Sequence, residues 1–190
     1  MNMKSNGKKR EAPFYEKPLE SESIFEGRVL RLFRDKVELP DGSAAYREVM
    51  RHNGAVCILP LTDEGEVVCV TQYRHAVGRS TLELPAGKLD TKDEDPESAA
   101  RRELREETGY ECDKMIYMGA MHGSPAILDE IIHLYLATDL RRGKAMPDEG
   151  EFVAVELHTL EELRTMIMGG EITDAKTQIA VLKAYLSLKA

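Results

Sequence analysis

Three carboxylates lie close together in one short stretch of the sequence, and their spacing suggests what chemistry they could do. Glu103 and Glu107 are four residues apart, and Glu106 is three residues beyond Glu103. In a helix this spacing brings the three side chains to one face within a single turn. Clustered hard oxygen ligands are what Mg²⁺ requires, and a metal ion held there could polarise a phosphate and activate water.

The competing interpretation is a solvated acidic face, because arginines at positions 101, 102 and 105 are interleaved and could form ion pairs. Two features favour the metal site. The three carboxylates are aligned, and a glycine-containing approach precedes the helix.

The neighbouring residues predict a helix over residues 95–108. Asp95 suits the N-cap, Pro96 suits the first helical position, and Gly109 suits the stop. Ala100 and Leu104 are four apart and can face a core.

The same stretch resembles the Nudix box, Gly-x5-Glu-x7-Arg-Glu-U-x-Glu-Glu-x-Gly-U, in which U is a bulky apolar residue. The residues that match in register are Glu94, Arg102, Glu103, Leu104, Glu106, Glu107 and Gly109, with Tyr110 as the final bulky residue. Six residues rather than five separate Gly87 from Glu94. We interpret the difference as a one-residue insertion within residues 90–93 that bulges without moving the helix.

The resemblance implies a Mg²⁺-dependent hydrolase, with Mn²⁺ as a possible substitute. Glu103 and Glu107 would bind the metals, Glu106 would lie beside them, and the carbonyl of Ala86 would add a ligand. Arg102 would orient the acidic cluster, and Glu94 would brace the loop. The expected catalytic and metal-binding residues in this region are Ala86, Arg102, Glu103, Glu106 and Glu107.

From Glu22 to Leu188 the chain resembles the ADP-ribose pyrophosphatase branch of the family, on residues 47–56, 72–87 and 124–125. By this resemblance Arg74 contacts the diphosphate or the terminal ribose, because Arg suits bidentate phosphate contacts. Arg47 and Glu48 would contact the base. The expected substrate-binding residues are Arg28, Arg47, Glu48, Arg74, Gly87 and Pro125.

Each of these residues also has a purely structural interpretation. Arg47 and Glu48 could belong to an ordinary cross-strand pair, Arg74 could lie on a solvated strand face, and Pro125 could be a turn residue. Arg28 stands where the resembling enzymes carry an aromatic residue that stacks on adenine, and Ala126 stands where they carry glycine. These departures favour a broader range of nucleoside diphosphate sugars.

An acidic loop covers residues 147–151. In the resembling enzymes a glutamate of this loop closes over the substrate as general base, or as a ligand to another metal ion, and here Glu149 and Glu151 are both candidates. The competing interpretation is a solvated surface loop.

Composition narrows the class of partner. The 190 residues carry a net charge of -8, which argues against a general nucleic-acid binder. No apolar run is long enough to span a membrane, and the basic N-terminus has no apolar segment typical of a secretory signal. Cys57, Cys69 and Cys112 are expected to be buried free thiols, which fits a reducing cytoplasm.

The order of elements predicts an α+β fold with a mixed sheet. Strand patterns begin near Ser23, and residues 55–59 and 67–71 are expected to form a hairpin around a turn at 63–65. Further strands are expected at residues 115–121, 130–137 and 152–157, and helices at 160–168 and 173–188. The resemblance implies a Nudix-type α/β/α sandwich preceded by an N-terminal antiparallel strand region.

We therefore expect a mobile arm over residues 1–20, a strand region over 21–50 that forms a homodimer, and a Nudix domain over 51–190. The expected activity is Mg²⁺-dependent hydrolysis of ADP-ribose to AMP and ribose 5-phosphate, or of related nucleoside diphosphate sugars. The alternatives are a Nudix hydrolase that prefers GDP-mannose or a dinucleotide, and a non-catalytic ADP-ribose-binding regulator.

Overall fold

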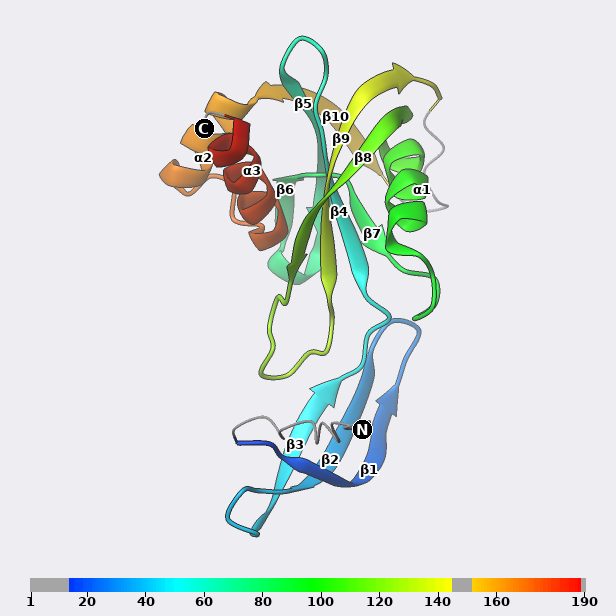
Figure 1. Cartoon of the computed structure of the whole chain (residues 1–190), viewed down its shortest axis with the longest axis vertical. Coiled ribbons are helices and arrows are strands. Elements are labelled where there is room, and N and C mark those ends of the chain that lie inside the picture. Colours follow the sequence, from blue (N-terminus) through cyan, green and yellow to red (C-terminus); the bar gives the residue numbers. More distant parts are fainter. Residues whose placement is uncertain (1–13, 145–151, 189–190) are drawn as a thin grey trace, which may run out of the picture. The chain divides into compact units, whose positions relative to one another are not determined.

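The computed structural model of the chain describes residues 14–144 and 152–188 (Figure 1). The chain divides into two compact units. One ends at His52 and also includes Ala126–Leu128, and the other comprises Asn53–Pro125 and the residues from Asp129 onwards.

The N-terminal unit is an antiparallel sheet of three strands in the order β1-β2-β3. The strands are β1 (Lys17–Glu26), β2 (Arg31–Glu38) and β3 (Ala44–Met50). β1 begins inside the segment 1–20 that the sequence analysis assigned to a mobile arm, so that boundary was wrong. Every residue of β1 is exposed, so the strand has no apolar alternation to reveal its start. Its first residue, Lys17, is instead held by pairing with Glu38 of β2.

The second unit contains two sheets and three helices. Four strands lie in the order β7-β4-β9-β8, with β4 and β9 parallel, and three antiparallel strands lie in the order β10-β5-β6. The strands are β4 (Ala55–Pro60), β5 (Glu66–Arg74), β6 (Arg79–Glu83), β7 (Ala86–Lys88), β8 (Tyr110–Met121), β9 (Ile132–Arg142) and β10 (Val153–Thr159). The helices are α1 (Pro96–Thr108), α2 (Leu160–Gly169) and α3 (Ala175–Leu188), and a short 3-10 turn, η1, covers His75–Val77.

The hairpin expected from residues 55–59 and 67–71 does not form. The turn is present, because the Gly65 amide donates to the Thr62 carbonyl at 3.0 Å. Beyond a single bridge between Leu61 and Val67 the two strands separate into different sheets. Both edges of β4 are taken by β7 and β9, and both edges of β5 by β6 and β10. No edge is therefore left for β4 and β5 to pair with each other.

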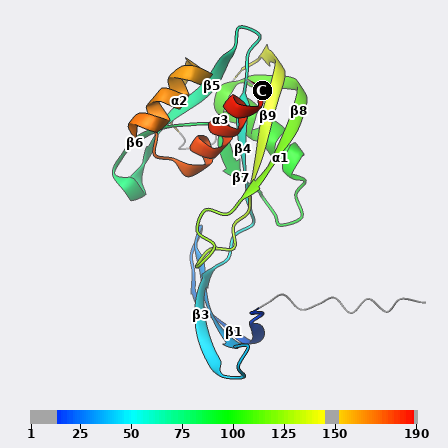
Figure 2. The ribbon, with the colours of Figure 1, turned by 60° about the vertical axis from the view of Figure 1, so that its left-hand side comes forward.

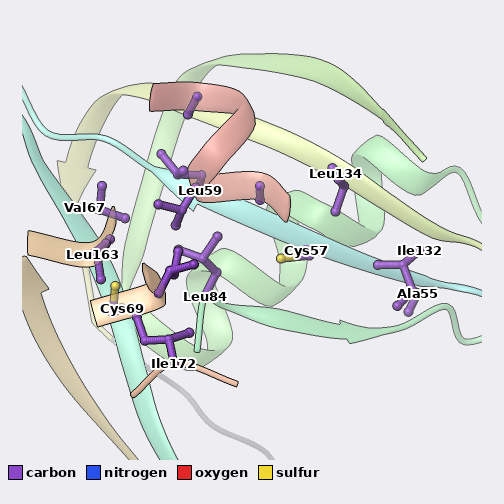
Figure 3. Packing of buried hydrophobic residues seen from close by; sticks show 14 residues of the cluster. Ala55, Cys57, Leu59, Val67, Cys69, Leu84, Ile132, Leu134, Leu163 and Ile172 are labelled. Atoms are coloured by element: carbon purple, nitrogen blue, oxygen red, sulfur yellow. The ribbon is translucent and has the colours of Figure 1, made fainter. Parts of the chain in front are cut away.

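Helices cover the sheets of this unit on two sides, as Figures 1 and 2 both show for α1 on one side and α2 with α3 on the other. Alternate residues of β4 point to opposite faces. Cys57 and Leu59 join the apolar cluster under α2 and α3 (Figure 3), whereas Val56 and Ile58 join the cluster under α1. This arrangement confirms the predicted α+β fold and its α/β/α sandwich with a mixed sheet.

The caps predicted for the acidic helix are confirmed. The Asp95 side chain accepts a hydrogen bond from the Ser98 amide at 2.9 Å, and Pro96 is the first residue of α1. Gly109 ends the helix with a φ of 75°, in the left-handed region that favours glycine. The helix buries Ala100 and Leu104 against the sheet, as expected.

The three cysteines are free and buried, as expected. Burial raises the pKa of the Cys57 thiol well above its ordinary range and that of Cys69 to about 12. Neither thiol is therefore available as a nucleophile at neutral pH. Across residues 14–144 and 152–188, no helix combines the length and the apolar character needed to cross a membrane.

Candidate active site

The site is built where strand β7 meets helix α1, and Gly87 makes the close approach possible. A Cβ atom added to Gly87 would lie 2.0 Å from the carboxyl carbon of Glu103 and 2.1 Å from its Oε1. Any side chain here would displace that carboxylate. The absence of a side chain at Gly87 therefore lets the Glu103 carboxylate lie against β7.

A second contact joins β7 to the same helix. The Ala86 amide donates to Oε2 of Glu107 at 3.0 Å. Glu107 has an exposed fraction of only 4%. The strand therefore fixes the carboxylate of Glu107 through the backbone of Ala86, the residue whose carbonyl is the expected further metal ligand.

Arg102 connects the acidic residues of the helix. Its Nη1 donates to Oε1 of Glu103 at 2.6 Å and to Oε2 of Glu106 at 3.1 Å. Burial disfavours the charged form of Arg102, but the charge and hydrogen bond of Glu103, with help from Glu106, outweigh burial and raise its pKa. Arg102 is therefore held positively charged among the carboxylates and reduces their mutual repulsion.

The loop before the helix is closed by Glu94. Its Oε2 accepts a hydrogen bond from the Asp90 amide at 2.6 Å, and its own amide donates to the Thr91 carbonyl at 3.3 Å. Nη2 of Arg102 lies 3.5 Å from Oε1 of Glu94. The extra residue of this loop is thus taken up in a turn, and α1 still begins directly after Asp95.

The donor set suits a hard divalent cation, because carboxylates gather here next to the backbone of β7. Within the described residues, no three His, Cys, Asp or Glu side chains form a complete ligand set. Water and the phosphate oxygens of a substrate would complete the coordination sphere, which is usual for Mg²⁺.

Arg74, at the end of β5, is tied to a residue that the sequence analysis did not assign to the site. Its Nε and Nη2 donate to the two carboxylate oxygens of Glu83 at 2.8 and 2.7 Å. Lys176 of α3 donates to the same carboxylate. The sequence clue was an acidic residue between two leucines, Leu82 and Leu84, where a buried charge must be paired.

Burial alone would raise the pKa of Glu83. Hydrogen bonds from Arg74 and Thr81, with the charge and hydrogen bond of Lys176, outweigh it and lower this pKa to about 2. Glu83 is therefore a carboxylate throughout the physiological range.

Three predicted substrate contacts lie in the N-terminal unit. Arg28 is exposed in the connection between β1 and β2, and Glu48 is exposed on β3 opposite Arg34. The guanidinium of Arg47 donates to both carboxylate oxygens of Glu16, at 3.0 and 2.6 Å. Arg47 and Glu48 are therefore not paired with each other.

The remaining predicted residues are in loops. Pro125 is exposed in the connection between β8 and β9. Glu149 and Glu151, the two candidates for the general base, lie outside the described residues.

A cavity of about 380 Å³ opens beside α1, but it does not contain the carboxylate cluster. Four arginines dominate its lining, and of the predicted site residues it includes only Arg102. The lining residues are Ser98, Arg101, Arg102, Leu104, Arg105, Glu111, Cys112 and Arg141. We therefore place the candidate site at the junction of β7 and α1.

The carboxylates that α1 presents beside β7 are of the ligand type that divalent-metal-dependent phosphohydrolases use. A family model described as "NUDIX domain" matches residues 50–178, and another described as "Nucleoside diphosphate sugar hydrolase N-terminal domain" matches residues 16–50. The chain belongs to the Nudix family of hydrolases, whose members generally need a divalent metal ion.

Two relatives match nearly the full chain. The methanol dehydrogenase activator of Bacillus methanolicus is 47% identical over 93% of this chain and 95% of its own length. The ADP-ribose pyrophosphatase of Bacillus subtilis (strain 168) is 45% identical over 92% of this chain and 94% of its own length. A crystal structure of an ADP compounds hydrolase shares the fold, with a TM-score of 0.81 at 22% identity, over 92% of this chain and 94% of that one.

Proposed function

We propose that this Nudix hydrolase cleaves the pyrophosphate bond of ADP-ribose, or of closely related nucleoside diphosphate sugars, with Mg²⁺ bound at the junction of β7 and α1. The observation that carries the proposal is the set of carboxylates on α1. Ala86 and Arg102 hold these carboxylates beside β7, and Gly87 of that strand leaves room for Glu103. The identity of 45% to an ADP-ribose pyrophosphatase supports the choice of substrate.

In this proposal Glu103 and Glu107 hold the metal ion, with Glu106 beside them and the carbonyl of Ala86 as a further ligand. The bound metal ion would polarise the phosphate and favour attack by water. Arg102 limits repulsion within the cluster, and Arg74 contacts the diphosphate of the substrate.

The general base is proposed to be Glu149 or Glu151, by resemblance alone. Phosphoryl transfer depends mainly on positioning and charge stabilisation, so these groups suffice without a covalent intermediate. Arg28, Arg47, Glu48 and Pro125 remain proposed contacts to the rest of the substrate.

The alternatives differ in substrate or in the presence of catalysis. GDP-mannose and dinucleotides contain the same diphosphate, so Arg74 and the metal ligands do not discriminate among them. A non-catalytic ADP-ribose-binding regulator is disfavoured because every acidic position of the box is retained. We place the activity in the cytoplasm, with Mn²⁺ able to replace Mg²⁺.

We also propose that the N-terminal unit forms a homodimer through its strands, Ser23 to Met50. Among its described residues, Val37 alone is buried, with an exposed fraction of 6%. Large apolar side chains on its strands and turns are exposed, namely Leu19, Ile24, Phe25, Val29, Leu30 and Tyr46. A second copy of the chain would cover this surface symmetrically.

A hydrolysis panel with product identification tests the activity. With Mg²⁺, ADP-ribose should yield AMP and ribose 5-phosphate faster than GDP-mannose, UDP-glucose, FAD or diadenosine polyphosphates yield their products. In H₂¹⁸O the isotope should enter one of the two phosphate products, which identifies the phosphorus attacked. Release of inorganic phosphate, or of ADP with free ribose, would contradict the proposed bond cleavage.

A further inference from the structure

A buried set of charges lies behind Arg74, and the carboxylate of Glu83 is its centre. Glu83 has an exposed fraction of 2%. It accepts hydrogen bonds from Nε and Nη2 of Arg74, from Thr81 Oγ1 at 2.6 Å and from Lys176 Nζ at 2.5 Å. The Glu83 carboxylate is therefore fully occupied by donors from β5, β6 and α3.

The first turn of α3 is held next to Glu83 by several hydrogen bonds. The Asp174 side chain accepts from the Thr177 amide at 2.9 Å, which caps the helix, and it also accepts from Lys176 Nζ at 2.9 Å. Thr177 Oγ1 in turn accepts from the Leu84 amide at 2.9 Å. Lys176 therefore stands between two carboxylates, one held by side-chain donors and the other by the Thr177 amide.

The charges in this set balance, since Arg74 and Lys176 oppose Glu83 and Asp174. Lys176 has a side-chain exposure of only 14%, but the Arg74 side chain is 42% exposed. Nη1 of Arg74 donates no hydrogen bond to any residue of the segments 14–144 and 152–188. One edge of the guanidinium is thus anchored, and the remaining nitrogen is available to a ligand.

We propose that Glu83 and Lys176 are positioning residues that hold Arg74 with Nη1 available to the diphosphate of the substrate. Lys176 has a distinct part in this, because it neutralises Asp174 and leaves Arg74 to be anchored by Glu83 alone. This inference rests on the proposed role of Arg74 as a substrate contact.

Removal of the Lys176 charge should move the arginine. In Lys176→Met, two carboxylates would face one guanidinium, and the donors of Arg74 would be shared between Glu83 and Asp174. Nη1 would then be drawn inwards, away from the substrate. The loss should appear in substrate binding and not in the chemical step, since no metal ligand is altered.

The test is a charge-rescue experiment with matched variants. Lys176→Met should raise KM for ADP-ribose about tenfold, the scale of one lost hydrogen bond to a charged group, with kcat changed less than about threefold. Asp174→Asn retains a good N-cap and removes the second carboxylate. The double variant Lys176→Met/Asp174→Asn should therefore return KM to within about threefold of the wild type.

Direct binding provides a readout that does not depend on turnover. The Kd for ADP-ribose in EDTA, measured by calorimetry, should follow KM across these variants. Arg74→Ala gives the full loss of affinity for ADP-ribose that is expected when the contact of Arg74 with the substrate is removed. Lys183→Met, an exposed lysine of the same helix, is the control and should bind as the wild type does. Lys176→Arg keeps the charge, so its Kd should stay within about threefold of the wild type.

Three results would overturn the positioning role. The first is a lower Tm for Lys176→Met with unchanged Kd, which would make Lys176 a structural residue only. The second is a Kd that the double variant fails to restore. The third is an unchanged Kd in Arg74→Ala, and in that case hydrolysis of ADP-ribose by the wild type would leave the proposed function intact. If the wild type prefers another sugar nucleotide, the Kd comparison still decides the positioning role.

Discussion

Glu107 combines burial, a backbone hydrogen bond and a proposed metal contact in one carboxylate. Its Oε2 accepts from the Ala86 amide, and a neutral amide side chain could accept the same bond. The structural and the metal-binding parts of this residue can therefore be separated by changing its charge alone.

Glu107→Gln should abolish turnover and leave the fold intact, because Gln keeps the hydrogen bond but lowers metal affinity and transition-state stabilisation together. Steady-state kinetics at saturating Mg²⁺ and a melting curve measure the two effects. Glu97→Gln, at a half-buried position in the first turn of the same helix, is the control and should retain activity. Wild-type activity in Glu107→Gln with an unchanged Tm would refute the ligand assignment.

Gly87→Ala should disturb the site without unfolding the protein. The added Cβ would collide with the carboxylate of Glu103, and that flexible side chain can swing away at small cost. A displaced ligand should lower kcat by about tenfold to a hundredfold, with the stability reduced by less than about 1 kcal/mol. Kinetics and urea unfolding test this, with Gly169→Ala as the control. An unchanged kcat would mean that Glu103 is not a ligand.

At the scale of elements, α1 presents the carboxylates proposed to bind the metal ion, and the start of the helix sets their register. Asp95 caps the helix directly after the turn that contains the extra loop residue. The cap therefore isolates the helix from the irregular loop before it.

Asp95→Ala should reduce the free energy of unfolding by about 1 kcal/mol, since it removes an N-cap hydrogen bond. Urea unfolding measures the change. Asp95→Asn should stay within a few tenths of a kcal/mol, because Asn is an equally good cap. Equal destabilisation by both substitutions would show that the charge of Asp95, and not its capping oxygen, is what matters.

At the scale of the whole molecule, the buried charges around Glu83 connect stability to pH. The pKa of Glu83 is lowered from its ordinary value of 4.5 to about 2. A depressed carboxyl pKa contributes stability that is complete above the unfolded value and is lost as pH falls through the folded value. The contribution should therefore disappear between about pH 5 and pH 2.

The size of this contribution is roughly 3 kcal/mol, from the difference between 4.5 and 2 at about 1.36 kcal/mol per pKa unit. Glu83→Gln does not titrate, so its free energy of unfolding should be lower at pH 7 but should fall less steeply below pH 5. Urea unfolding at several pH values measures both slopes. If the free energy of unfolding falls equally steeply below pH 5 in Glu83→Gln and in the wild type, the depressed pKa of Glu83 is contradicted.

The proposed homodimer also belongs to this scale. Sedimentation at micromolar concentration should give a dimer, and Phe25→Glu should shift it to a monomer, because the change places a charge in the exposed apolar surface of the N-terminal unit. Leu186→Glu on α3, which is also exposed, is the control and should remain dimeric. A monomer for the wild type at this concentration would exclude the interface.

The sequence by itself determined the acidic helix and the family. Asp95, Pro96 and Gly109 act through neighbours a few residues away, so the limits of α1 could be predicted from local chemistry. The box pattern is equally local, because a helix converts the spacing of Glu103, Glu106 and Glu107 into a shared face. The separation of β4 from β5 could not be predicted, since it depends on which distant strands take their edges.

Only the tertiary structure decided how Arg74 is held. Glu83 and Lys176 are 93 residues apart in the chain, and their ion pair exists because α3 packs its first turn against the end of β6. The contact of Gly87 with Glu103 likewise depends on β7 lying across α1. Local spacing identifies which groups a segment can present, but pairing between distant charges follows from packing, because burial forces each charge to find a partner.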